Sequence, residues 1–129
     1  MRTLRLGLAL ILVSGGAHAA ELDWAKAEAV DIATAEYRFE PDRIELRSGV
    51  PYRLHFANHG KELHEFNAAA LFRASELANP EVLNPDRTEI ALHPGETKDL
   101  LLMPKAAGNF AVICPDHDWA GMTAEVVVR

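Results

Sequence analysis

Apolar and polar residues alternate along the chain in short runs that are separated by turn residues. In "VPYRLHFAN", Tyr52, Leu54 and Phe56 share one parity, so their side chains should face a core together. Turn signals stand between the runs at "NHG", "NP", "HPGE" and "AAGN". The other expected strands cover residues 30–32, 44–46, 88–92, 97–103, 109–114 and 124–128. This pattern is typical of an antiparallel, all-β domain.

One segment interrupts this alternation. "AAALFRASELA", residues 68–78, is rich in helix formers and is followed by Asn79 and Pro80, which end helices. The sequence therefore predicts a β-sandwich with a short helical insertion around residues 68–78. Packing against the sandwich is the role we expect for the insertion.

The first 19 residues have the layout of a secretory signal peptide. Arg2 and Arg5 precede an apolar run at 6–13, and small residues lead to an A-x-A ending at Ala19. The apolar run is too short to span a bilayer. We expect cleavage after Ala19 or Ala20, export to the periplasm, and no membrane insertion of the mature protein. Residues 20–129 should then form a single domain.

The charge of the chain restricts its partners. The formal net charge is −6, and it becomes −8 when Arg2 and Arg5 leave with the signal peptide. Nucleic acids and anionic membranes are therefore disfavoured as partners, and a basic protein is favoured.

The single cysteine raises a question of chemistry. In an oxidising compartment Cys114 cannot form an internal disulfide, so it must be buried, bonded to another chain, or bound to a metal. The stretch "ICPDHDWAGM" places His117 and Met122 in the same loop, directly after an expected core strand. Upstream, His64 in "NHGKELHEFN" precedes Phe66 on a short expected strand and should reach the same end of the sandwich. His59 is a competing candidate in the same turn region.

Two imidazoles, one thiolate and one weak thioether form the ligand set of a blue-copper electron-transfer site. Structural zinc sites prefer more than one thiolate and rarely recruit methionine, which disfavours zinc. Nucleophilic catalysis by Cys114 with His117 as base is also disfavoured, because the sequence offers no evident oxyanion hole or third orienting group.

The chain resembles the cupredoxin family, in particular its plastocyanin and pseudoazurin branch. The resemblance rests on C-x-x-H-x-x-x-x-M at Cys114, His117 and Met122, on His64, and on "YRFEPDRIELRSGVPYRLHFAN" near the N-terminus. It implies a Greek-key β-sandwich with one type 1 copper ion at one end. The implied ligands are His64, Cys114, His117 and, more weakly, Met122, with His117 partly exposed as the electron port.

Two positions depart from the family pattern. Glu65 follows the first histidine where family members commonly have asparagine, and an ionised carboxylate accepts hydrogen bonds but donates none. Asp116 stands where plastocyanin-like loops usually have proline, so its backbone N–H is free to point at the Cys114 sulfur. We expect such a hydrogen bond to raise the reduction potential.

These observations predict a one-electron carrier that is not an enzyme and is a monomer. Trp119 beside His117 either offers an apolar surface to a redox partner or packs inside the loop. A basic c-type cytochrome is the partner that the charge favours. The alternative is a periplasmic copper-handling protein that buffers copper, confers resistance, or delivers copper to an enzyme.

Overall fold

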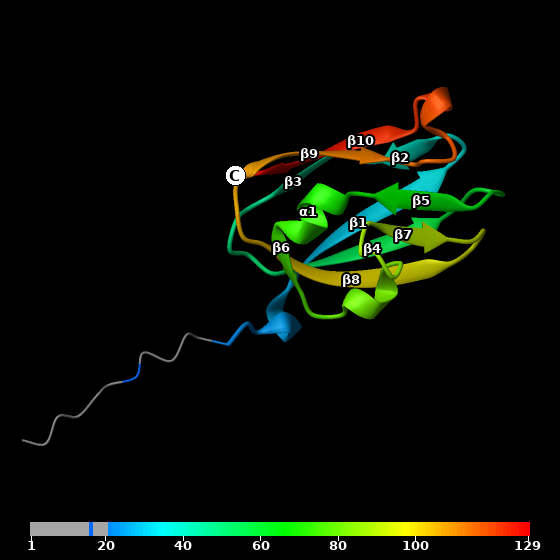
Figure 1. The fold of residues 1–129 in the computed structure, drawn as a ribbon. Coiled ribbons are helices and arrows are strands. Elements are labelled where there is room, and N and C mark those ends of the chain that lie inside the picture. Colours follow the sequence, from blue (N-terminus) through cyan, green and yellow to red (C-terminus); the bar gives the residue numbers. More distant parts are fainter. Residues whose placement is uncertain (1–15, 17–20) are drawn as a thin grey trace, which may run out of the picture.

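The computed structural model describes Gly16 and residues 21–129, which fold into two facing β-sheets (Figure 1). The first sheet has the order β2 (Arg38–Glu40), β1 (Glu28–Ala35), β4 (Tyr52–Asn58), β8 (Thr97–Pro104), β6 (Ser75–Leu77). The second has the order β3 (Arg43–Leu46), β10 (Thr123–Val128), β9 (Gly108–Ile113), β5 (His64–Asn67), β7 (Glu89–Leu92). Three 3₁₀ turns, η1 (Trp24–Lys26), η2 (Pro80–Val82) and η3 (Asp118–Ala120), and one α-helix complete these residues. The predicted β-sandwich is confirmed.

Two strand pairs differ from the expected antiparallel pattern. β1 runs parallel to β4, and β3 runs parallel to β10. Neither pair is joined by a hairpin, so the path of the chain between the two sheets sets their direction rather than a tight turn.

The core lies between the sheets, where the alternation predicted it. Tyr52, Leu54 and Phe56 are all buried on one face of β4. Phe66 on β5 is fully buried and contacts three aromatic rings, with centroid distances of 4.9 Å to Phe56, 5.5 Å to Phe39 and 6.4 Å to Phe72. These rings join the two sheets into one hydrophobic core.

The segment 68–78 contains the predicted helix, but the helix is shorter than its sequence suggests. α1 covers only Ala69–Arg73, and residues Ser75–Leu77 form β6 instead. β6 pairs with β8 in the other sheet, so this segment carries the chain from one sheet to the other. The open edge of β8 offered backbone hydrogen bonds that outweigh the helix propensity of "SEL". Leu71 and Phe72 of α1 are buried in the core.

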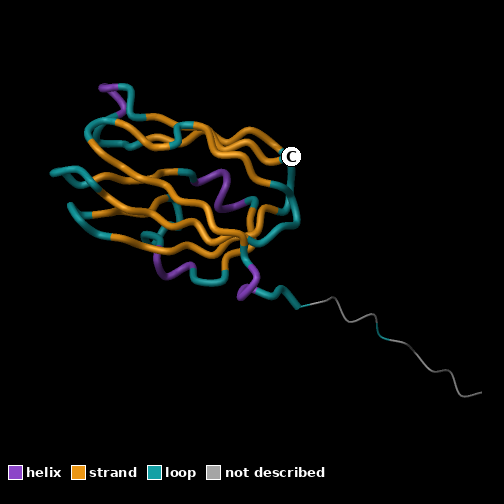
Figure 2. The backbone as a smooth tube through the Cα atoms, turned by 180° about the vertical axis from the view of Figure 1, so that it is seen from behind, coloured by secondary structure: helices purple, strands orange, loops and turns teal. Residues whose placement is uncertain are grey.

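Several loops meet at one end of the sandwich. The β9–β10 connection with η3, the β4–β5 loop and the β1–β2 turn all lie there, and the C-terminus lies at the opposite end (Figures 1 and 2). β5 and β9 are neighbours in their sheet, with Asn67 opposite Ile113. His64 and the loop after β9 therefore share this end.

None of the helices that the structure describes has the length and apolar character needed to cross a membrane. The predicted signal peptide, residues 1–19, lies outside the described part of the chain except for Gly16.

Phe66→Ala should reduce the free energy of unfolding by about 3–5 kcal/mol, because it removes a ring that no other side chain can replace in a closed core. Chemical denaturation of the metal-free protein measures this loss. Glu76→Ala, at an exposed position on β6, serves as the control and should stay within about 0.5 kcal/mol of wild type. Equal losses in the two variants would contradict the assignment of Phe66 to the core.

Candidate metal centre

His64 opens β5 and points inward from it. It has the same parity as Phe66, and its side chain has 0% exposure. Asn58 fixes the loop that precedes it: its side-chain amide donates to the carbonyls of Glu62 at 2.8 Å and Leu92 at 2.9 Å, while its side-chain oxygen accepts from the Gly60 amide at 2.8 Å. The short β4–β5 loop is therefore held in one shape before the histidine.

Gly60 in this loop lies against the carboxylate of Glu36. A Cβ at this position would collide with both carboxylate oxygens unless the Glu36 side chain moved, so glycine lets the loop approach this carboxylate in its observed position.

Cys114, His117 and Met122 lie in the connection from β9 to β10. The Cys114 amide donates a hydrogen bond to the Met122 carbonyl at 3.0 Å, and the His117 amide donates one to the Cys114 carbonyl at 3.0 Å. The Met122 amide donates to the His117 carbonyl at 3.3 Å. Gly121 ends η3 with a φ of +79°, which turns the chain back so that Met122 re-enters the core. These bonds close the loop into a compact unit.

The fold brings three of the four predicted ligands together as a cluster of donor atoms. One atom each from His64, Cys114 and His117 lie within 4.8 Å of one another, and all three residues are buried. The two imidazole rings have their centroids 5.0 Å apart. Met122 is fully buried beside them, tied to Cys114 and His117 through its backbone. His59, the competing candidate, is exposed on the β4–β5 loop.

The ring nitrogens of the cluster fit a metal ion. The Nδ1 atom of His64 is buried and has no hydrogen-bond partner among the described residues. The Nδ1 atom of His117 lies 3.4 Å from the Cys114 sulfur. A buried lone pair without a partner is costly, and a bound cation is one way to satisfy it. This set of soft sulfur and imidazole donors suits copper.

Cys114 is held in its neutral form in the metal-free protein. Burial raises the pKa of the thiol to about 11, although the backbone amides of Glu65 and Asp116 oppose the rise. The Asp116 amide thus acts on the sulfur, and its expected effect on the reduction potential stays a prediction. Because thiolate is the form that binds metal, a metal ion must displace this proton when it binds.

Glu65 ties the two ligand segments together without an amide side chain. Its backbone N–H donates to the Cys114 sulfur at 3.5 Å, and the thiol donates to its carboxylate at 3.2 Å. Burial is the main cause that raises the pKa of this carboxyl. The departure at position 65 therefore changes the chemistry of the tie but keeps the contact between β5 and the loop.

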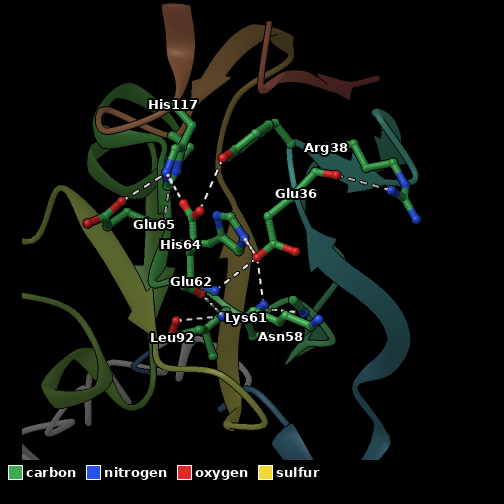
Figure 3. Close-up of polar contacts among 12 residues, drawn as sticks. Glu36, Arg38, Asn58, Lys61, Glu62, His64, Glu65, Leu92 and His117 are labelled. Atoms are coloured by element: carbon green, nitrogen blue, oxygen red, sulfur yellow. Dashed lines mark hydrogen bonds and ion pairs between the residues drawn. The ribbon is translucent and has the colours of Figure 1, made fainter. Parts of the chain in front are cut away.

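His117 is more covered than the family resemblance implies. Its side chain keeps only 11% of its exposure, because the ring of Tyr37 stacks on it at 4.8 Å and the carboxylate of Glu62 binds its Nε2 at 2.8 Å. Figure 3 shows the Glu62 carboxylate next to the His117 ring. We expected a partly exposed imidazole, but the structure shows His117 almost completely buried.

Glu36, Tyr37 and Glu62 were not identified from the sequence. Glu36 binds Nε2 of His64 at 3.2 Å and accepts from the amides of Lys61 at 2.6 Å and Glu62 at 2.9 Å. Acidic residues in turns are ordinary, and only the packing of the β1–β2 turn on the β4–β5 loop brings these side chains to the histidines. No sequence signal marks them.

Trp119 does not pack inside the loop. Its side chain is 75% exposed, while its indole N–H donates to the Asp116 carbonyl at 2.8 Å. Its ring centroid lies 5.8 Å from that of Tyr37. Two aromatic rings therefore form an exposed surface beside His117.

Residues 5–128 match the model of the cupredoxin-like domain. The chain belongs to this family. A curated relative, the copper-resistant cuproprotein CopI of Rubrivivax gelatinosus, is 31% identical over 131 residues, which cover 88% of this chain and 79% of that protein. The resemblance to cupredoxins that the sequence indicated is confirmed.

Solved cupredoxin structures share the fold at low identity. The reduced auracyanin of Roseiflexus castenholzii has a TM-score of 0.59 and 16% identity, covering 80% of this chain and 98% of that one. The copper nitrite reductase of Nitrosomonas europaea has the same TM-score of 0.59 and 16% identity, covering 81% of this chain and 50% of that one. Both electron carriers and enzymes thus use this fold, so the fold alone does not assign an activity. Together, the family and the His-Cys-His cluster support one copper ion per chain.

The Glu36 carboxylate should make the stability of the metal-free protein depend on acid. Hydrogen bonds from the Lys61 and Glu62 amides lower its pKa from 4.5 to about 2. Because the folded pKa is lower than the unfolded one, the stabilisation is complete above pH 4.5 and is lost as the pH falls toward 2. The melting temperature of Glu36→Gln should therefore lie below that of wild type at neutral pH. This difference in melting temperature should become smaller as the pH falls from 4.5 to about 2.

Circular dichroism melts across this pH range measure the gap. Glu76→Gln, an exposed carboxylate on β6, is the control and should show no such narrowing. A constant gap for Glu36→Gln would show that the charge of Glu36 contributes nothing to stability.

Proposed function

We propose that this cupredoxin is a periplasmic protein with one type 1 copper ion, which carries single electrons between larger redox proteins and is not an enzyme. His64, Cys114 and His117 are the strong ligands in this proposal, and Met122 is the weak axial ligand. The observation that carries it is the buried cluster in which one atom from each of the three strong ligands lies within 4.8 Å of the others. A copper ion at this site supplies a one-electron couple between Cu(II) and Cu(I).

The surrounding residues suit electron transfer with little rearrangement. The loop that holds Cys114 and His117 is closed by backbone hydrogen bonds, and β5 holds His64 from the neighbouring strand. Met122 and Cys114 are fully buried, so water is kept from the sulfur atoms. A rigid, dry donor set spares the protein the cost of rebuilding its ligands when the charge of the metal changes.

A basic redox partner, such as a c-type cytochrome, fits the surface at this end. Trp119 and Tyr37 provide an apolar contact, and Asp116, Asp118 and Glu62 provide exposed or partly exposed acidic groups around it. The negative net charge, −6 for the full sequence and −8 without Arg2 and Arg5, adds a longer-range attraction. We propose brief, salt-sensitive docking at this surface by a monomeric protein.

A second candidate, copper handling for resistance or delivery, is favoured by the similarity to a copper-resistant cuproprotein at 31% identity. The covered His117 ring also agrees with a site that retains its ion. The same four ligands serve both functions, so the partner distinguishes them.

The ligand assignment predicts the outcome of copper titration. Purified protein should take up one copper(II) ion with an intense sulfur-to-copper visible band and a narrow copper hyperfine splitting. Cys114→Ser should abolish the band because it removes the thiolate, and His64→Ala should disrupt it. His59→Ala, an exposed histidine on the same loop, is the matched control and should retain the wild-type spectrum. A colourless one-to-one adduct of the wild type would refute the type 1 site.

The carrier proposal predicts fast electron exchange with a basic cytochrome c. Stopped-flow rates should fall at least tenfold between low and high ionic strength, because opposite charges steer the encounter. Asp118→Lys, near the exposed Trp119, should slow the reaction, whereas Glu76→Lys on the distant β6 should have little effect. Negligible electron exchange together with rapid copper transfer to an acceptor protein would favour copper handling instead.

A further inference from the structure

Both histidines of the cluster have a carboxylate on Nε2 of the ring. Nε2 of His117 lies 2.8 Å from Oε2 of Glu62, and Nε2 of His64 lies 3.2 Å from Oε1 of Glu36 (Figure 3). The two carboxylates come from different segments, the β1–β2 turn and the β4–β5 loop. The contact is therefore a repeated feature of the site and not a single surface ion pair.

These contacts select one form of each imidazole. An ionised carboxylate only accepts hydrogen bonds, so the Nε2 atom it contacts must carry the proton. A neutral imidazole has one N–H, which leaves Nδ1 with its lone pair. Nδ1 is thus the nitrogen that is left to bind a metal: that of His64 is buried without a partner among the described residues, and that of His117 is 3.4 Å from the sulfur.

The carboxylates are themselves held in place. Glu36 accepts hydrogen bonds from the Lys61 and Glu62 amides, and Glu62 accepts one from the Tyr37 hydroxyl at 3.1 Å. Tyr37 in turn stacks on the ring of His117. Glu36, Tyr37, Glu62 and the two histidines thus form one connected network, which we call the carboxylate clamp. Such a network fixes ring orientation better than isolated surface carboxylates would.

We propose that Glu36 and Glu62 are positioning residues that hold His64 and His117 with Nδ1 toward the metal, an inference that rests on the proposed copper site. A carboxylate on the distal N–H also makes the imidazole a stronger donor. A stronger donor favours the more highly charged Cu(II), so the clamp raises Cu(II) affinity and lowers the reduction potential. Its effect on the potential opposes that of the Asp116 amide on the sulfur.

The test compares three variants of the full-length mature protein. Glu62→Ala removes the acceptor, Glu62→Gln keeps an oxygen that accepts but removes the charge, and Asp118→Asn removes one exposed charge from the ligand loop without touching a ring of the clamp. Cu(II) dissociation constants are measured by competition with a chelator of known affinity, and potentials by redox titration.

We expect Glu62→Ala to weaken Cu(II) binding by about 10–100-fold and to raise the potential more than Asp118→Asn does. Glu62→Gln should retain more of the affinity than Glu62→Ala, and Asp118→Asn should stay within about threefold of wild type, the size expected for an exposed charge. Equal changes of Cu(II) affinity and potential in Glu62→Ala and Asp118→Asn would show that only the net charge matters, and they would overturn the proposal. Wild-type affinity in Glu62→Ala would also overturn it.

A second measurement does not require copper. Long-range ¹H–¹⁵N spectra of the metal-free protein at pH 8 report which ring nitrogen carries the proton. We expect the Nε2–H form alone for His64 and His117 in wild type, and a mixture for His117 in Glu62→Ala. Glu36→Ala should have the corresponding effect on His64, with the ring of His117 as its internal control. If wild type fails to form the type 1 site but shows these ring forms, the copper proposal fails while the clamp remains.

A mixture of ring forms for both histidines in wild type would overturn the clamp whatever the copper site does. Thermal unfolding of the metal-free variants distinguishes positioning from folding. A positioning role leaves the melting of Glu62→Ala close to that of Asp118→Asn, since Glu62 is 47% exposed. A large drop in melting temperature that accompanies the affinity loss, with the Nε2–H form retained, would assign Glu62 a structural role instead.

Discussion

The site depends on the pairing of β5 with β9, two strands that lie far apart in the sequence. This pairing puts His64 next to the loop that begins at Cys114, and the Glu65 amide contacts the Cys114 sulfur across the same boundary. A single register slip would turn His64 away from the core, because successive side chains on a strand face opposite sides. The aromatic contacts of Phe66, two residues further along β5, hold that register.

The metal-free site is a compromise between burial and chemistry. Burial keeps the Cys114 thiol protonated. It also leaves Nδ1 of His64 without a partner among the described residues, and this orphaned atom costs stability in the absence of a metal. The hydrophobic core, to which Cys114 and Met122 belong, offsets that cost. A bound metal ion would satisfy the unpartnered nitrogen and recover this free energy.

The His117 ring is covered by other side chains and does not lie open at the surface above the cluster. Tyr37 and Glu62 cover His117, and Trp119 stands out beside them. An electron that enters through this end would pass an aromatic and carboxylate layer before it reaches the ring. The same layer would slow the exchange of a bound ion with solvent. Electron carriage and copper retention therefore make similar demands on this surface.

The sequence by itself determined most of the strands and the candidate donors. Alternation placed Tyr52, Leu54 and Phe56 in the core, and the residue types of His64, Cys114, His117 and Met122 carried the metal chemistry, because period and ligand softness are local properties. Tertiary structure decided the rest. It turned residues 75–77 into a strand at the edge of β8, set two strand pairs parallel, and brought Glu36, Tyr37 and Glu62 onto the histidines. Those outcomes depend on which distant segments meet, and no short-range pattern encodes that.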